Sequence, residues 1–133
     1  MKQLSVFLEN KAGTVVEVLK ELKAAGVQLH AISIADTAEY GICRLICDDA
    51  QNACQVLRSC GFVSSVTDVF AVRMDDKPGS AADIVEMFTA AGVGLAYLYS
   101  AIIGGTPFLV FRTDDSDKAV DIIASNGLSV AEF

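Results

Sequence analysis

Residues 75–80 read DDKPGS, and residues 9–14 read ENKAGT. The lysine and the glycine stand at the same places in both stretches, 66 positions apart. Each stretch follows a short apolar run and precedes apolar residues at helical spacing, which predicts a strand before it and a helix after it. Both stretches are therefore expected to be tight turns, in which glycine supplies a backbone conformation that other residues avoid.

The first half of the chain is predicted to run strand, helix, strand, strand, helix, strand. Polar and apolar residues alternate over residues 2–8, as in a half-buried strand. Apolar residues then recur at helical spacing until Gly26, which is a typical helix end. The remaining expected elements are strands at residues 27–34 and 42–47, a helix at 50–57 that ends before Gly61, and a strand from Phe62.

Capping residues are expected where the helices start. Thr14 and Ser80 each stand three positions before an acidic residue, which is the spacing of a capping box. Aspartate pairs at residues 48–49 and 114–115 precede the other two helices, where the helix dipole favours negative charge. These signals predict where the four helices begin.

The second half of the chain repeats the first at a constant offset of 66 residues. The motif AAGV occurs at residues 24–27 and again at 90–93, and the aspartate pairs have the same spacing. No insertion or deletion is needed, and no linker rich in proline or glycine separates the halves. Self-similarity at a fixed offset indicates an internal duplication. The expected repeats are residues 1–66 and residues 67–133.

Each repeat is expected to adopt a ferredoxin-like βαββαβ fold of the α+β class, with an antiparallel sheet and helices on one face. Together the repeats are predicted to contain four helices and eight strands. Residues 93–99, VGLAYLY, are apolar or aromatic on both sides of a predicted strand. Because an open sheet face in water is ordinarily polar, the helix-free face of the second repeat is expected to pack against another sheet, in the same chain or in a partner. We accordingly expect a homodimer.

Composition argues against several classes of partner. The chain has 133 residues, of which 53% are hydrophobic and 20% charged, and a net charge of −7. Nucleic-acid binding needs clustered positive charge, so no nucleic-acid partner is expected. No apolar run reaches the roughly 18 residues of a membrane-spanning helix, and residues 1–10 lack the long apolar segment of a signal peptide. We expect no membrane partner and a cytoplasmic location.

The sequence shows no pattern typical of a metal or catalytic site. The four cysteines form no C-x-x-C pair and are accompanied by a single histidine, His30. They are Cys43, Cys47, Cys54 and Cys60. We expect reduced thiols that serve as small core residues. No nucleophile stands beside a base at readable spacing, so no catalytic residue, metal or cofactor is expected.

The order of strand, glycine turn, helix, AAGV and strand resembles the ACT domain, a small ligand-sensing module of amino-acid biosynthetic enzymes such as phosphoglycerate dehydrogenase and aspartokinase. The resemblance covers the whole chain, twice. It implies paired domains that hold an amino-acid effector between the turn after the first strand and the second strand of the neighbouring domain. By this resemblance Asn10 matches the turn asparagine that binds the effector in serine-sensing members, and Gln28 stands where such members have a second asparagine. The second repeat departs from the pattern, with Asp76 and Gly94 at these positions.

A glycine turn at a helix start can supply what a free amino acid needs. Backbone N–H groups and the positive end of the helix dipole suit its carboxylate. Asn10 or Asp76 can accept from its ammonium, and glycine lets the backbone approach closely. The candidate ligand-binding residues are Asn10, Lys11, Ala12, Gly13, Thr14, Gln28 and His30 in the first repeat, and Asp76, Lys77, Pro78, Gly79 and Ser80 in the second.

Other interpretations of these residues stay open. Gly13 and Gly79 also fit left-handed turns without a ligand, Lys11 and Lys77 fit solvated loop charges, and His30 fits an ordinary strand residue. The expected function is a regulatory or sensor protein that binds a free L-amino acid and acts on a metabolic enzyme or regulator. The alternatives are a small ferredoxin-like enzyme and a protein-interaction module with a vestigial pocket.

Overall fold

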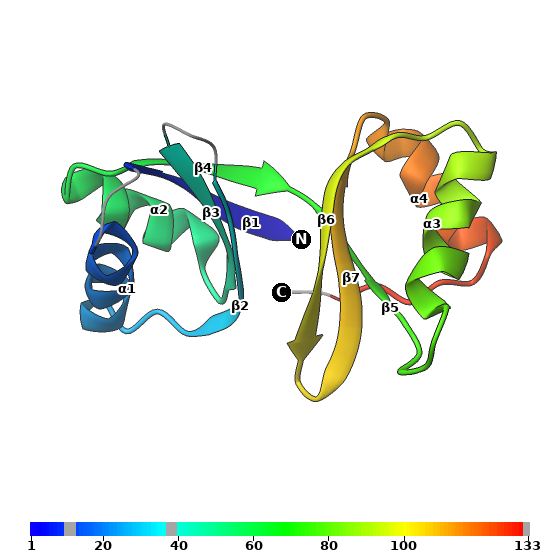
Figure 1. Cartoon of the computed structure of the whole chain (residues 1–133), viewed down its shortest axis with the longest axis horizontal. Helices are drawn as coiled ribbons and strands as arrows, with labels where there is room; N and C mark the ends of the chain where they lie inside the picture. Colours follow the sequence, from blue (N-terminus) through cyan, green and yellow to red (C-terminus); the bar gives the residue numbers. More distant parts are fainter. Residues whose placement is uncertain (10–12, 37–39, 132–133) are drawn as a thin grey trace. The chain divides into compact units, whose positions relative to one another are not determined.

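A computed structural model describes residues 1–9, 13–36 and 40–131 of the chain (Figure 1). The chain divides into two compact units. The first unit is Lys2–Asp68, and the second unit is Met1 together with the chain from Val69 onward. Among the described residues, no helix is both long enough and apolar enough to cross a bilayer. The cytoplasmic location stays a prediction.

The first unit has a four-stranded antiparallel sheet with its two helices on one face (Figure 1). The strand order is β2-β3-β1-β4, so the first strand lies between the third and the fourth. Its elements are β1 (Lys2–Glu9), α1 (Thr14–Ala24), β2 (Leu29–Asp36), β3 (Tyr40–Cys47), α2 (Ala50–Ser59) and β4 (Val63–Asp68). This element order and strand order confirm the ferredoxin-like fold predicted for the first repeat.

The second unit has the same order of elements and places its helices on one face of its sheet (Figure 1). Its strand order β5-β7-β6 matches the order β1-β3-β2 of the first unit. Its elements are β5 (Phe70–Arg73), α3 (Ser80–Ala90), β6 (Leu95–Ile103), β7 (Thr106–Thr113) and α4 (Ser116–Ser125).

The prediction of eight full strands is wrong for the described part of the chain, which has seven. In place of the eighth strand, Val72 and Val130 form an isolated antiparallel bridge. Two backbone bonds flank this bridge: the N–H of Arg73 donates to Ser129, and the N–H of Ala131 donates to the carbonyl of Ala71. The final segment therefore runs beside β5 as a fourth strand would, but only over residues 129–131.

Proline explains why β5 ends two positions earlier in the repeat than β1. The register pairs Arg73 with Phe108, so Pro107 follows as the partner of Met74. The N–H of Met74 donates to the carbonyl of Pro107, but proline has no N–H to return a bond. The ladder ends there. In the first unit Gly41 stands at the equivalent place, and pairing continues beyond it to Glu9.

The capping-box prediction is wrong for α1 and α3. Gly13 and Gly79 are the N-cap residues, with φ of 89° and 88°, and the helices begin with the hydroxyl residues themselves. The Ser80 hydroxyl instead accepts a hydrogen bond of 2.9 Å from the backbone N–H of Asp75. This bond connects the turn just after β5 to the start of α3. The helix start is thus set by the left-handed glycine, a conformation that costs other residues about 1–2 kcal/mol.

The aspartates before α2 and α4 cap these helices as expected. Asp49 accepts a hydrogen bond from the N–H of Asn52, and Asp115 accepts one from the N–H of Lys118, each at 3.0 Å. All four helices then end in the same way, with a glycine at positive φ followed by an apolar residue whose N–H bonds back into the last turn. The four glycines are Gly26, Gly61, Gly92 and Gly127.

Each unit has its own hydrophobic core between the sheet and the helices. In the first unit, Leu4, Leu22 and Leu57 are fully buried. In the second unit, Phe88 and Phe111 meet edge to face at 4.9 Å between ring centroids. Three thiols are buried as expected, at Cys43, Cys47 and Cys54. The prediction is wrong for Cys60, which is the C-cap residue of α2 and is exposed.

Candidate functional site

The turn between β5 and α3 brings together all five residues predicted for the second repeat. Asp76, Lys77, Pro78, Gly79 and Ser80 line one cavity of about 510 Å³. The first residues of α3 and Pro107 of β7 complete its walls. The glycine at the N-cap offers no side-chain acceptor to the first-turn N–H groups of α3, so these donors and the positive helix end face the turn.

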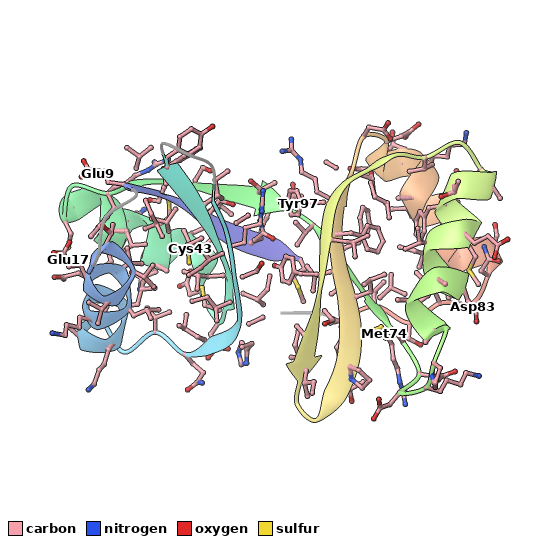
Figure 2. All side chains as sticks on the ribbon, viewed as in Figure 1. Glu9, Glu17, Cys43, Met74, Asp83 and Tyr97 are labelled. Carbon is pink, nitrogen blue, oxygen red and sulfur yellow. The ribbon has the colours of Figure 1, made fainter. Side chains whose placement is uncertain are left out.

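A second cavity, of about 310 Å³, shares part of this turn. Asp75, Lys77 and Ser80 line both cavities. The second cavity adds Asp83 from the first turn of α3 and the segment after α4, at residues 127–129. Figure 2 labels Met74, which lines both cavities, and Asp83. Sequence reasoning missed the segment after α4, because no local signal places residues 127–129 beside the turn at residues 75–80.

The charged residues of the smaller cavity differ in how they are partnered. The Lys77 ammonium lies 3.7 Å from the Asp75 carboxylate, and both side chains are largely exposed. Arg73 and Asp83 also line this cavity. Among the residues that the structure describes, neither of these two side chains takes part in an ion pair or a side-chain hydrogen bond. The cavity therefore holds one guanidinium and one carboxylate that are not paired.

The first unit has a corresponding cavity of about 500 Å³. Thr14, the buried first residue of α1, lines it together with Glu9 and Glu17, which are labelled in Figure 2. The segment after α2, at residues 60–63, forms another wall. Except for Cys60, these positions correspond, at the offset of 66, to residues that line the smaller cavity of the second unit. The predicted residues Asn10, Lys11 and Ala12 lie outside the described residues.

Gln28 and His30 lie at the other end of the same sheet from Gly13 and Thr14. Leu29 pairs with Cys47 at the end of β3, whereas Glu9, at the turn, pairs with Tyr40 at its start. Within the first unit, the structure therefore does not bring Gln28 and His30 together with the predicted turn.

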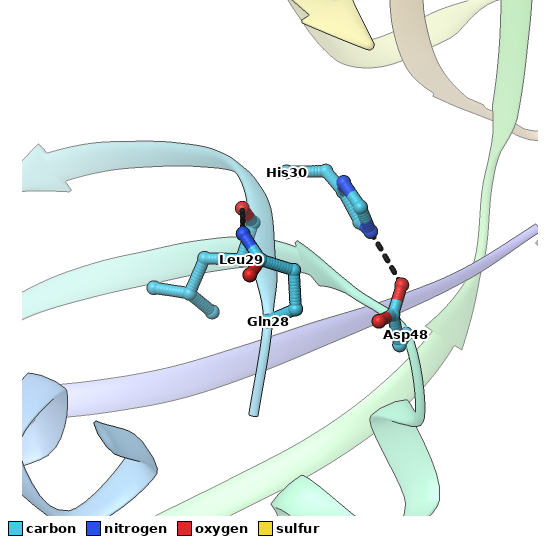
Figure 3. Close-up of polar contacts among 4 residues, drawn as sticks. All are labelled: Gln28, Leu29, His30 and Asp48. Carbon is cyan, nitrogen blue, oxygen red and sulfur yellow. Dashed lines mark hydrogen bonds and ion pairs between the residues drawn. The ribbon is translucent and has the colours of Figure 1, made fainter. Parts of the chain in front are cut away.

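The two residues make local contacts instead (Figure 3). The Gln28 side-chain amide donates to the carbonyl of Leu29 at 3.1 Å. The His30 Nε2 lies 2.5 Å from a carboxylate oxygen of Asp48. In the second unit, the N–H of Gly94 donates to Asp114 at 3.0 Å. The contacts of His30 with Asp48 and of Gly94 with Asp114 each connect the start of an outer strand to the aspartate pair before a helix.

Three of the four thiols, those of Cys43, Cys47 and Cys60, have raised pKa values. Burial raises the pKa of Cys43 to about 11, from an ordinary value of 9.0. Burial and the charges of Asp48 and Asp49 raise the pKa of Cys47. A hydrogen bond to the Glu21 carboxylate, with a sulfur to oxygen distance of 3.3 Å, raises the pKa of Cys60. Reactive cysteines have lowered pKa values, so these three thiols have the character of structural residues.

Metal ligands do not cluster in the described residues: no three histidine, cysteine, aspartate or glutamate side chains are placed to hold one ion.

Comparison with protein families gives a match to the family described as "ACT domain pair" over residues 1–132. A crystal structure of a protein from Bacteroides thetaiotaomicron is 32% identical, with a TM-score of 0.90, and the alignment covers 98% of this chain and 90% of that one. The regulatory subunit of aspartate kinase from Thermus thermophilus, in its ligand-free form, is 12% identical with a TM-score of 0.65, over 93% and 91% of the two chains. That second likeness shows the fold. A search of curated proteins found no match.

Proposed function

This chain belongs to the ACT domain pair family, and from that membership we propose that it is a regulatory protein that binds a free L-amino acid without catalysing a reaction. The site we propose is the glycine turn after the first strand of a repeat. The regulatory role is carried over from the aspartate kinase subunit of the same fold, whose name describes it as regulatory. Its partner would be a metabolic enzyme or a regulator.

The observation that carries this proposal is the repetition of one cavity at the same place in both units. Each cavity lies beside a helix start with glycine at the N-cap, at Gly13 and Gly79. Helix starts of this kind attract carboxylates through backbone N–H groups and the helix dipole. Carboxylate side chains also line each cavity, at Glu9 and Glu17 or at Asp75 and Asp83, and these attract an ammonium group. A free amino acid carries both of the groups that such a cavity attracts.

Binding of the amino acid would raise the stability of the folded protein and change the surface that the turn presents to a partner. A ligand present at a hundred times its dissociation constant stabilises the folded state by about 2.7 kcal/mol. An ordered turn presents a different surface to a partner, and the coupling between such sites is typically about 1–3 kcal/mol. No chemical step is involved.

The first experiment is a thermal-shift screen of the full chain with the twenty L-amino acids, followed by calorimetry on those that raise Tm. Gly13→Val and Gly79→Val should each weaken binding at their own turn, because valine is strained at positive φ and displaces the helix start that lies beside each cavity. Gly105→Val is the matched control: it also replaces a glycine at positive φ, in the hairpin before β7, and lines none of the cavities described above.

Two results would overturn parts of this proposal. If none of the twenty amino acids binds, the chain is not an amino-acid sensor, and the interaction module with a vestigial pocket is favoured. If an amino acid binds with the same affinity to both turn variants and to the control, the turns are not the site.

A further inference from the structure

Resting on the proposed function, we infer that the amino-acid site of the second unit is its smaller cavity, and that its ligand is a zwitterion with an apolar side chain. Arg73 holds the ligand carboxylate, and Asp83 holds the ligand ammonium. The side chain of the ligand lies on Met74, Met87 and Leu128. The larger cavity, which Pro78 and Gly79 line, is not the binding site.

The two charges that carry this inference are of opposite sign, line one cavity and remain unpaired. Arg73 is the last residue of β5 and is exposed, and Asp83 lies in the first turn of α3. Neither forms an ion pair among the described residues, whereas the neighbouring Lys77 and Asp75 lie within 3.7 Å of each other. A guanidinium matches the planar shape of a carboxylate, and charge-assisted hydrogen bonds are about twice as strong as neutral ones. The pair suits the two charged groups of a free amino acid.

Apolar side chains form one part of the remaining lining, beside the polar residues Asp75, Lys77, Ser80 and Ser129. Ile84 is buried, and Met74, Met87 and Leu128 are partly buried against the core around Phe88. Methionine side chains adapt to apolar groups of different shape. The volume of about 310 Å³ stands at the lower end of the roughly 300–1,000 Å³ of small-molecule sites. This volume suits a small ligand. Because Asp75 and Lys77 lie within 3.7 Å of each other, the apolar part of the lining favours an aliphatic side chain over one with a second charge.

The first unit lacks one half of this arrangement in its described residues. Glu17 replaces Asp83, so a partner for the ammonium remains. Phe7 replaces Arg73, and its ring lies 6.0 Å from the ring of Tyr40. The charged residues described in that cavity are both acidic, Glu9 and Glu17. The second unit is therefore the stronger site for a zwitterion, although its turn is the one that departs from the serine-sensing pattern.

The test uses calorimetry on the full chain with L-leucine, L-methionine, L-leucine methyl ester and N-acetyl-L-leucine. The ester lacks the carboxylate charge and the acetylated form lacks the ammonium charge. L-leucine or L-methionine should bind at least about tenfold more tightly than L-serine or L-aspartate, since each additional buried CH₂ strengthens binding about fourfold. L-leucine should also bind at least about tenfold more tightly than either derivative.

The variants Arg73→Gln and Asp83→Asn test which charged group of the ligand each side chain binds. Arg73→Gln should weaken L-leucine binding at least about tenfold and leave the affinity for the methyl ester unchanged. Asp83→Asn should weaken L-leucine binding similarly and leave the affinity for N-acetyl-L-leucine unchanged. Arg112→Gln and Asp121→Asn are matched controls, because both residues are exposed in the second unit and line none of the cavities described above. Thermal melting checks that every variant is folded.

The outcomes separate this inference from the proposed function. An absence of binding by all twenty amino acids overturns the proposed function itself. If an amino acid binds but its affinity is the same in Arg73→Gln, Asp83→Asn and the controls, the proposed function stands and this inference is wrong. Loss of binding in Glu17→Gln alone would place the site in the first unit and also overturn it. Preferred binding of L-serine or L-aspartate would contradict the apolar specificity.

Discussion

At the scale of single residues, the buried thiol of Cys43 makes stability depend on pH in the alkaline range. Its pKa is raised to about 11 in the folded protein, against an ordinary 9.0 in an unfolded chain. Below pH 9 the thiol is protonated in both states and contributes nothing to the pH dependence. Between about pH 9 and 11 the unfolded state loses the proton that the folded state keeps, so stability falls as pH rises.

We predict that Cys43→Ala removes about 2 kcal/mol of this alkaline loss of stability by pH 11. Urea unfolding under reducing conditions, at several pH values from 8 to 11, gives the free energy of unfolding for the wild type and the variant. Cys60→Ala is the control, because that thiol is exposed and burial is not the main cause of its raised pKa. Parallel pH profiles for the wild type and Cys43→Ala would show that this thiol is not responsible.

The sequence alone predicted part of what single residues do in the structure. Apolar spacing placed three cysteines in the core, because buried strand and helix positions recur with fixed periods. The exposure of Cys60, the C-cap residue of α2, could not be predicted from that spacing. The sequence also could not predict that the unpaired Arg73 and Asp83 line one cavity. That cavity exists only when β5, α3 and the segment after α4 pack together.

At the scale of elements, the N-cap aspartates are a feature that the duplication has kept in both units. Asp115 accepts a hydrogen bond from the N–H of Lys118 and satisfies one of the unpaired donors at the start of α4. We predict that Asp115→Ala lowers the free energy of unfolding by about 1 kcal/mol. Asp117→Ala in the same helix is the control, since it loses only the favourable interaction of a first-turn charge with the helix dipole, worth a few tenths of a kcal/mol. Equal losses in the two variants, measured by urea unfolding, would contradict the capping role.

The order of the elements was predictable, whereas some of their ends were not. The glycine that ends each helix could be seen in the sequence, because an αL glycine followed by an apolar residue is a local signal. The capping boxes at Thr14 and Ser80 failed because the preceding glycine takes the N-cap position. The early end of β5 depends on Pro107, which lies more than thirty positions further along the chain. Cross-strand register of this kind is a tertiary property and leaves no local signal.

At the scale of the whole molecule, the duplication at offset 66 made the fold predictable. The sequence signals of both halves had to agree with a single order of helices and strands. The same duplication is a poor guide to the site. The two cavities occupy equivalent places, yet Phe7 stands where the second unit has Arg73. Packing constrains the positions of core residues in both repeats, whereas exposed residues at a cavity rim are free to diverge. Gly94 is an exposed position that is not free to diverge. A Cβ added there would lie 2.8 Å from the Asp114 carboxylate, which is too close.

The predicted homodimer belongs to this largest scale. β2 and β6 are the outermost strands of their sheets, and an outer strand offers backbone groups to another strand. Ile32 on β2 and Leu98 on β6 occupy equivalent positions in the repeat and are 47% and 46% exposed. Ile102, also on β6, is 72% exposed. Exposed aliphatic side chains along an outer strand favour association with a second copy of the chain.

We therefore expect sedimentation equilibrium at micromolar concentration to give twice the mass of one chain. The double variant Ile32→Glu with Leu98→Glu should shift the protein to monomers, because a glutamate buried in an apolar contact loses its hydration without gaining a partner. Val16→Glu is the control: Val16 is exposed to a similar extent, at 48%, but lies on α1. A wild type that sediments as a single chain would contradict the dimer. A double variant that keeps the dimer mass would show that the outer strands do not form the interface.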